Sequence, residues 1–253
     1  MWRSILIEGH VLTQSTSILS NDVTSMTALR LCASPQPWDY ADRNCAAIED
    51  HWRSVLASGA SYFNGTVYLT RDIVRDDTGL NVQLSPVAFK AYLYWRDQGF
   101  PDVGMLDGFG SGLIRSADGA IVLVRQRPGN INSGLYYLPG GFIDPRDVGA
   151  DGTIDIRASV VREVQEETGL GSADVVLDPG FWVTRAGVQL SFAVGLRSSL
   201  GCDDLLAQVR LHIRDHPEGE LEDALVVRAA SDYVGLPMPP YARALLSTIL
   251  PET

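Results

Sequence analysis

The sequence is poor in cysteine. Cys32, Cys45 and Cys202 are its only three cysteines, they are widely scattered, and no two of them form a C-x-x-C pair. An odd number of separated cysteines is typical of reduced thiols rather than of disulfides. We therefore expect reduced thiols and a cytoplasmic protein.

The sequence also lacks long apolar runs and an excess of positive charge. No run approaches the roughly 18 apolar residues of a membrane-spanning helix, and Ile5–Ile7, closed by Glu8, is too short for a secretory signal. Lys and Arg number 20 against 31 Asp and Glu, for a net charge of −11. Such a surface disfavours nucleic acid and anionic membranes as partners, and no helix-turn-helix pattern is present. A small anionic substrate would need local arginines or a metal ion at its site.

What the sequence does contain is an ordinary globular composition in two differently patterned parts. Of the 253 residues, 45% are hydrophobic and 20% are charged, and there is no internal repeat. Residues 1–103 predict a small α+β extension, since strand-like alternation surrounds helical patterns. Its expected elements are a strand near Ser4–Ile7, a helix over Asp42–Ser58, a hairpin of Tyr62–Leu69 with Leu80–Leu84, and a helix opened by Pro86 that continues to Trp95.

Residues 104–253 predict a larger mixed α/β domain, because strand and helix patterns alternate along them. The turn Ser116–Gly119 marks a hairpin, and Asp155 is placed to cap a helix that ends at Thr168. The expected elements are the hairpin of Gly108–Arg115 with Ala120–Arg127, the helix to Thr168, strands at Val175–Leu177 and Phe181–Leu196 with a break at Ala186-Gly187, a helix over Asp203–Asp215, a strand at Ala224–Val227 and a terminal helix over Pro240–Leu250.

The helix that ends at Thr168 carries an unusual acidic face. Glu163, Glu166 and Glu167 are spaced i, i+3, i+4, so their carboxylates share one side, and Gly169 is placed as a C-terminal cap. Three such carboxylates repel one another. A hard cation such as Mg²⁺ would relieve that repulsion, because it prefers oxygen ligands and is commonly shared with a phosphate. The alternative interpretation is a solvated acidic face.

This stretch resembles a known family motif. The nine residues Arg162–Leu170 resemble the second half of the Nudix hydrolase box, G-x5-E-x7-R-E-U-x-E-E-x-G-U, in which U is aliphatic. The family places a P-G-G element before the box, and Pro139-Gly140-Gly141 matches it. The resemblance implies the Nudix α/β/α sandwich and a hydrolase that cleaves phosphorus-containing anhydrides with Mg²⁺, or with Mn²⁺ in its place. It also implies the catalytic and metal-binding residues, which are Glu163, Glu166, Glu167 and the backbone carbonyl of Gly141, with Arg162 orienting a glutamate.

The first half of the box departs from the family pattern. Counting back from Arg162 puts the box glutamate at Ile154 and the box glycine at Val148, whereas the available glycine, Gly141, stands seven residues earlier. We therefore expect a loop that is seven residues longer and lacks its glutamate. A loop aspartate could supply the carboxylate, although each aspartate is equally interpretable as a polar loop residue or a helix cap. The candidates are Asp144, Asp147, Asp151 and Asp155.

Two further groups of charged residues are candidates for the substrate site. Arg125 and Arg127 alternate along a strand, so both point from one face, and guanidinium groups bind phosphate in a bidentate manner. A solvated edge strand is the alternative for this pair. An acidic loop before the last strand could hold a general base or be simply solvated, whereas His212 and His216 are interpreted as structural. The glutamates of this loop are Glu218, Glu220 and Glu222.

Scattered features resemble the Nudix subgroup that hydrolyses UDP-glucose and UDP-galactose. They are the β-rich extension with Phe63-Asn64-Gly65, the long loop after Pro139-Gly140-Gly141, and the segment His216–Glu222. The resemblance implies a Mg²⁺-dependent pyrophosphohydrolase that converts a UDP-sugar to UMP and a sugar 1-phosphate. ADP-ribose or a nucleoside triphosphate is the alternative substrate, and a catalytically impaired nucleotide-sugar sensor, favoured by Ile154, is the alternative class. The expected partner is a nucleoside diphosphate derivative, and a homodimer is left open.

The extension is expected to border the substrate cleft. A substrate with a second moiety needs walls beyond the acidic helix, and aromatic faces suit a nucleobase or a sugar. The alternative is that the aromatic residues of the extension form its own core. The aromatic residues concerned are Tyr62, Phe63, Tyr92, Tyr94 and Trp95.

Overall fold

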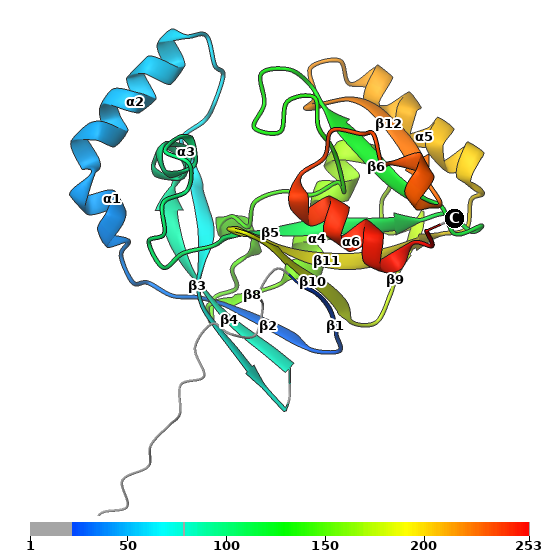
Figure 1. The fold of residues 1–253 in the computed structure, drawn as a ribbon, viewed down its shortest axis with the longest axis horizontal. Helices are drawn as coiled ribbons and strands as arrows, with labels where there is room; N and C mark the ends of the chain where they lie inside the picture. Colours follow the sequence, from blue (N-terminus) through cyan, green and yellow to red (C-terminus); the bar gives the residue numbers. More distant parts are fainter. Residues whose placement is uncertain (1–21, 78, 253) are drawn as a thin grey trace, which may run out of the picture.

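A computed structural model describes residues 22–77 and 79–252 (Figure 1). The strand expected near Ser4–Ile7 lies outside the described residues. Within the described part of the chain, no helix is long and apolar enough to cross a membrane.

A mixed eight-stranded sheet forms the centre of the molecule. Its path runs β1-β10-β11-β5-β6-β12, with β7 added to β6 and β9 added to β11. The pairing of β5 with β11 is parallel and the other pairings in this sheet are antiparallel. The strands are β1 (Val23–Met26), β5 (Asp107–Arg115), β6 (Ile121–Gln126), β7 (Tyr136–Tyr137), β9 (Val175–Leu177), β10 (Phe181–Ala186), β11 (Gln189–Ser198) and β12 (Leu221–Val227).

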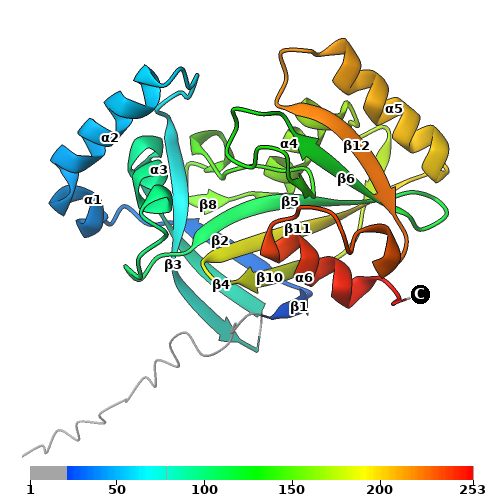
Figure 2. The same ribbon diagram turned by 45° about the horizontal axis from the view of Figure 1, so that its top comes forward.

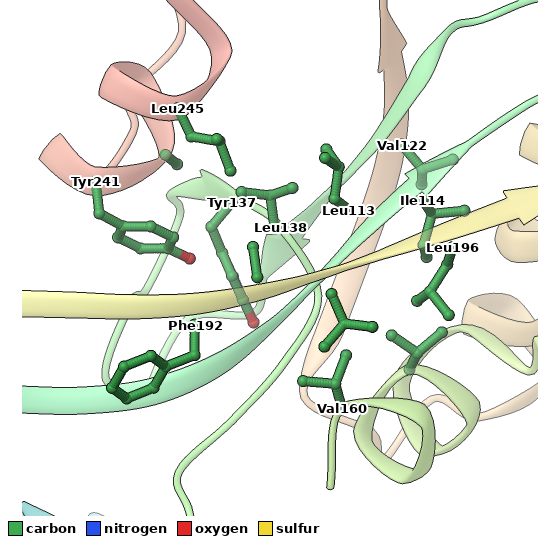
Figure 3. Packing of buried hydrophobic residues seen from close by; sticks show 14 of the residues in the cluster. Leu113, Ile114, Val122, Tyr137, Leu138, Val160, Phe192, Leu196, Tyr241 and Leu245 are labelled. Atoms are coloured by element: carbon green, nitrogen blue, oxygen red, sulfur yellow. The ribbon is translucent and has the colours of Figure 1, made fainter. Parts of the chain in front are cut away.

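Three helices cover this sheet, as the sequence pattern predicted. They are α4 (Ile156–Thr168), α5 (Cys202–Asp215) and α6 (Pro240–Ile249). Successive residues of a strand point to opposite faces, and β5 shows which helix lies on which face. A Cβ on Gly110 would meet Val160 of α4 at 2.7 Å, whereas the ring of Phe109 contacts that of Tyr241 of α6, with centroids 4.7 Å apart. The arrangement is therefore an α/β/α sandwich, with α4 and α6 on opposite sides of the strands (Figures 2 and 3).

Most of the residues before β5 build a second sheet with its own helices. The four-stranded sheet has the order β3-β4-β2-β8, in which β2 and β4 are parallel. Its strands are β2 (Leu29–Ala33), β3 (Thr66–Asp76), β4 (Gly79–Ala88) and β8 (Thr153–Ile154), and the helices are α1 (Asp39–Arg43), α2 (Cys45–Ala57) and α3 (Phe89–Asp97).

Two expectations for this part are wrong in detail. Pro86 does not open a helix, because it lies inside β4 opposite Tyr68, and α3 begins three residues later at Phe89. The helix expected over Asp42–Ser58 is two helices that meet at Asn44. The hairpin of β3 with β4 is present, and both strands are longer than the alternating segments indicated.

Strands cross the expected boundary between residues 103 and 104 in both directions. From the extension, β1 joins the central sheet by pairing with β10. From the larger part, β8 joins the extension's sheet, where Ile154 pairs with Leu31 of β2. Ile154 is only 4% exposed and belongs to the main hydrophobic core. The extension is thus bound to the segment that leads directly into α4.

The burial of Ile154 gives a first prediction. We expect Ile154→Glu, which would place a glutamate at the position found by counting back from Arg162, to destabilise the protein, because an unpaired carboxylate would enter an apolar core. Ile154→Val, the matched control, should cost only about 0.5–1.5 kcal/mol. Chemical denaturation of both variants measures the difference. Equal free energies of unfolding for Ile154→Glu and the wild type would show that this strand does not hold the two sheets together.

Candidate active site

Helix α4 is positioned by local caps at both ends. The Asp155 carboxylate accepts hydrogen bonds from the Arg157 and Ala158 N–H groups, both at 3.1 Å. Gly169 ends the helix with φ 75°, a left-handed conformation that glycine adopts without strain. Both predicted caps are confirmed. Val160 and Val164 are fully buried against the central sheet, so the rotation of the helix about its axis is set.

The three glutamates of α4 lie in different environments. Glu167 accepts a hydrogen bond from the Gly140 N–H at 2.8 Å, and burial raises its pKa well above the usual value. Glu163 is largely buried, which raises its pKa, and it contacts the Arg162 guanidinium. The Glu166 side chain is 54% exposed.

Gly141 packs directly against the Glu163 carboxylate, which a side chain at position 141 would displace. A Cβ on Gly141 would lie 2.5 Å from a carboxylate oxygen of Glu163, which is closer than side-chain atoms approach one another. The P-G-G element is held there by β5, because the Gly110 N–H donates to the Gly141 carbonyl at 3.1 Å. The structure therefore brings Gly141 together with the predicted carboxylates.

A loop carboxylate pairs with Arg162. Asp147 Oδ1 lies 2.9 Å from Arg162 Nη2, and the Asp147 side chain is 3% exposed. Asp144 is more distant from the same nitrogen, at 3.9 Å. The other two candidates have local roles, since Asp151 accepts hydrogen bonds from Thr153 and Asp155 caps α4.

This contact identifies Asp147, among the four candidate aspartates, as the carboxylate in place of the missing box glutamate. Gly141 and Asp147 have the box spacing G-x5-acid, with aspartate in place of glutamate. Fourteen residues separate Asp147 from Arg162, where the box has seven. The seven extra residues therefore follow the acidic position, and they include β8. Counting back from Arg162 failed because it crossed this insertion.

A cleft of about 980 Å³ contains all three glutamates of α4 and Gly141. Residues of the extension form another part of its lining, among them Tyr62, Phe63 and Tyr92. The expectation that the extension borders the cleft is confirmed for these three, although Tyr92, only 2% exposed, also belongs to the extension's own core. The alternative holds for Trp95, which is fully buried and hydrogen-bonded to the Pro101 carbonyl, and Tyr94 packs against Tyr40.

The two predicted substrate-binding arginines are held by other parts of their own chain. Arg125 Nε lies 3.0 Å from a Glu222 oxygen. Arg127 donates to the carbonyls of Gly219 at 3.1 Å and Leu221 at 2.7 Å. Among the described residues, neither of these two arginines lines the cleft. Their side chains connect the end of β6 and the residue after it to Gly219 and to the first two residues of β12.

Sequence reasoning missed an arginine that does line the cleft. Arg146 lies 2.6 Å from Asp144 and 3.6 Å from Glu166. Its place between the P-G-G element and Asp147 was the available signal. Glu220 lines the cleft as well, and so do His212 and His216, whose rings stack with centroids 4.1 Å apart.

Comparison with known proteins identifies the fold around this cleft. The family model described as NUDIX domain matches residues 110–201, which include Gly141, Asp147 and the acidic face of α4. The chain carries a Nudix domain. The resemblance stated for Arg162–Leu170 is thereby confirmed for this domain.

Solved structures similar to the chain include other Nudix proteins. A Nudix hydrolase from M. smegmatis, RenU, is 16% identical, with 56% of this chain and 87% of that chain covered and a TM-score of 0.36. The MutT protein from Methanosarcina mazei Go1 is 18% identical, with 56% and 91% covered and a TM-score of 0.35. No curated protein matches the chain significantly.

The Nudix site has a donor set suited to a divalent cation. Five carboxylates face only two guanidinium groups here, and Glu167 is buried, so ionising all of them requires a further positive charge. Oxygen donors are those that Mg²⁺ prefers. Among the described residues, no three such side chains converge into a preformed metal site. The carboxylates are Asp144, Asp147, Glu163, Glu166 and Glu167, and the guanidinium groups are those of Arg146 and Arg162.

The pair of Asp147 with Arg162 can be tested by a matched substitution. We expect Asp147→Asn to lower turnover about 10–100-fold, because the amide holds Arg162 less firmly and Arg162 in turn contacts Glu163. Asp151→Asn, in the same loop but exposed, should leave turnover near the wild-type value. Steady-state kinetics on both variants decides the matter. Equal activities would mean that the pair does not position the site.

Another buried carboxylate lies in the cleft lining at the start of β5. Asp107 is 5% exposed, and its Oδ2 accepts a hydrogen bond from the Tyr92 hydroxyl at 3.1 Å. Burial raises the pKa of Asp107 from 3.8 to about 7, against the smaller opposing effects of the Tyr92 hydrogen bond and Arg96. The folded protein therefore retains this proton over a pH range in which the unfolded chain has lost it.

This shift predicts a pH-dependent stability difference. Protonated Asp107 favours the folded state fully below pH 3.8, and that contribution is lost as the pH rises to about 7. Asp107→Asn does not titrate, so its free energy of unfolding should rise relative to the wild type between pH 4 and 8, by up to about 4 kcal/mol. Urea denaturation across this range measures the difference. A constant difference would contradict the shifted pKa.

Proposed function

We propose that this Nudix domain is a Mg²⁺-dependent pyrophosphohydrolase that acts on a nucleoside diphosphate linked to a second moiety. A UDP-sugar is the preferred substrate, with UMP and a sugar 1-phosphate as products. The observation that supports this proposal most strongly is the single cleft, which joins the α4 carboxylates to an aromatic wall from the extension. Its volume of about 980 Å³ suits a ligand with a moiety on each side of the diphosphate.

In this proposal the residues of the cleft have separate roles in binding the cation and the phosphate. Glu163, Glu166 and Glu167 would hold the cation together with the Gly141 carbonyl, and Arg146 would bind a phosphate through its guanidinium group. Bound Mg²⁺ supplies polarisation of a phosphoryl oxygen and a lower pKa for a coordinated water. All three cysteines are free thiols, in keeping with the cytoplasmic location that we propose.

The alternative of an impaired sensor loses its main support. Ile154 suggested that an acidic residue of the box was missing, but Asp147 occupies the box spacing and contacts Arg162. ADP-ribose and nucleoside triphosphates remain the alternative substrates, because they carry the same diphosphate group.

Activity on a panel of nucleotides tests the proposal. We expect UDP-glucose or UDP-galactose to be hydrolysed faster than ADP-ribose or nucleoside triphosphates, with release of UMP that stops when EDTA removes the metal. Glu166→Gln and Glu167→Gln should each lower kcat by roughly 10²–10⁴-fold, because charge stabilisation in the transition state is lost.

Glu49→Gln is the control for these variants. Glu49 is exposed on α2 and pairs with Lys90, outside the cleft lining, so its loss should leave kcat near the wild-type value. Thermal melting of each variant separates loss of fold from loss of chemistry. Wild-type turnover by Glu167→Gln at saturating Mg²⁺ would exclude the proposed role of the α4 carboxylates.

A further inference from the structure

The cleft has a second polar region, away from the carboxylates of α4. Asp107 and Gln189 are the first residues of β5 and β11, they face each other in the parallel register of these strands, and both line the cleft. Asp107 precedes Gly110 by three residues, and Gly110 is bonded to Gly141 beside Glu163. Three residues of a strand span about 10 Å, so this region lies roughly one nucleoside away from the P-G-G element.

Two buried oxygens in this region lack hydrogen-bond partners. Asp107 Oδ2 is bonded to Tyr92, but Asp107 Oδ1 and Gln189 Oε1 are buried and have no partner among the described residues. Buried polar atoms are nearly always hydrogen-bonded, and an unpaired one calls for an explanation such as a ligand. Both residues line an open cleft, so a ligand can reach this region.

Aromatic rings flank the two polar side chains. Tyr62, Phe89, Phe142 and Phe109 all line the cleft. The ring of Phe142 lies 4.8 Å from that of Tyr92, whose hydroxyl holds Asp107, and 6.0 Å from that of Phe89. A flat, partly polar group that lies against such rings gains contact area. Together with the two polar side chains, these rings suit a planar heterocycle that has hydrogen-bonding groups along one edge.

The donors and acceptors define which heterocycle fits. An ionised Asp107 only accepts hydrogen bonds, whereas the Gln189 amide can present either its oxygen or its NH₂ group to a ligand. We propose that Asp107 and Gln189 bind the edge of a nucleobase in which a ring N–H stands next to a carbonyl. The N–H donates to Asp107 and the carbonyl accepts from Gln189. Uracil and guanine have this edge, while adenine and cytosine lack the ring N–H.

This inference depends on the proposed function in taking the ligand to be a nucleotide, and it adds the class of base. Binding without catalysis tests it separately from hydrolysis. The experiment is calorimetric titration of the full chain with UMP, N3-methyl-UMP, GMP, CMP and AMP in EDTA at pH 8, where Asp107 is mostly ionised. We expect UMP and GMP to bind at least about tenfold more tightly than CMP and AMP, and N3-methylation of UMP to remove its advantage.

Variants then assign the preference to the two side chains. Asp107→Ala should bind UMP and N3-methyl-UMP equally, and Gln189→Ala should reduce the affinity for UMP and GMP toward that for AMP. Asp72→Ala, an exposed strand residue outside the cleft lining, is the control and should behave as the wild type. Thermal melting checks each fold. If Asp107→Ala does not fold, the variant of the half-buried Gln189, Gln189→Ala, tests the inference.

The outcomes separate this inference from the proposed function. Equal affinity of the wild type for all five nucleotides, or a preference that survives in the folded variants, would overturn the inference. A preference for GMP over UMP supports the inference and replaces the UDP-sugar as substrate. Selective binding of UMP without hydrolysis of any UDP-sugar supports the inference and refutes the proposed activity.

Discussion

The close approach of α4 to β5 is the contact on which the site depends. Val160 and Val164 occupy the space that side chains at Gly110 and Gly112 would fill, since a Cβ there would lie 2.7 and 2.4 Å from the valine methyl groups. The same two glycines donate to the carbonyls of Gly141 and Pro139, at 3.1 and 2.6 Å. One stretch of β5 therefore positions both the helix and the P-G-G element. The carboxylates face Gly141 because both are held by the same strand.

The insertion before α4 connects this site to the extension. Its strand β8 pairs with β2, while β1 returns to the central sheet beside β10. Asp155, whose side chain caps α4, also donates its backbone N–H to the Asp147 carbonyl at 3.1 Å. The aromatic side of the cleft and its acidic side are thus parts of one connected framework. The lengthened loop, which in the sequence suggested only a missing box glutamate, is the element that joins the two sheets.

Electrostatics set the requirements on a ligand of this cleft. The chain has a net charge of −11, and carboxylates outnumber guanidinium groups around α4. A polyanionic substrate approaches such a surface only with compensating cations. The remote region around Asp107 differs in kind, because burial there leaves a carboxylate whose pKa is about 7 and which interacts with Tyr92. The cleft therefore has a strongly charged region at α4 and a separate hydrogen-bonding region around Asp107.

Local signals in the sequence determined α4 and its chemistry. The cap at Asp155, the end at Gly169 and the shared face of the glutamates follow from spacings within a few residues, where the helical repeat alone decides geometry. Most strands and helices after residue 104 were predictable for the same reason, since hydrophobic periodicity is a local property.

Tertiary structure alone decided the features that depend on distant partners. Asp147 has the box spacing from Gly141, but its contact with Arg162 across the insertion appeared only on folding, and Ile154 was interpretable only once it met Leu31. Arg125 and Arg127 are bound by Gly219 and the first two residues of β12, which their alternation could not reveal. Asp107 had no motif at all, and its raised pKa comes from burial under elements far apart in the chain. Periodicity reports which face a residue occupies, and only the packing of that face against other segments decides which atoms meet there.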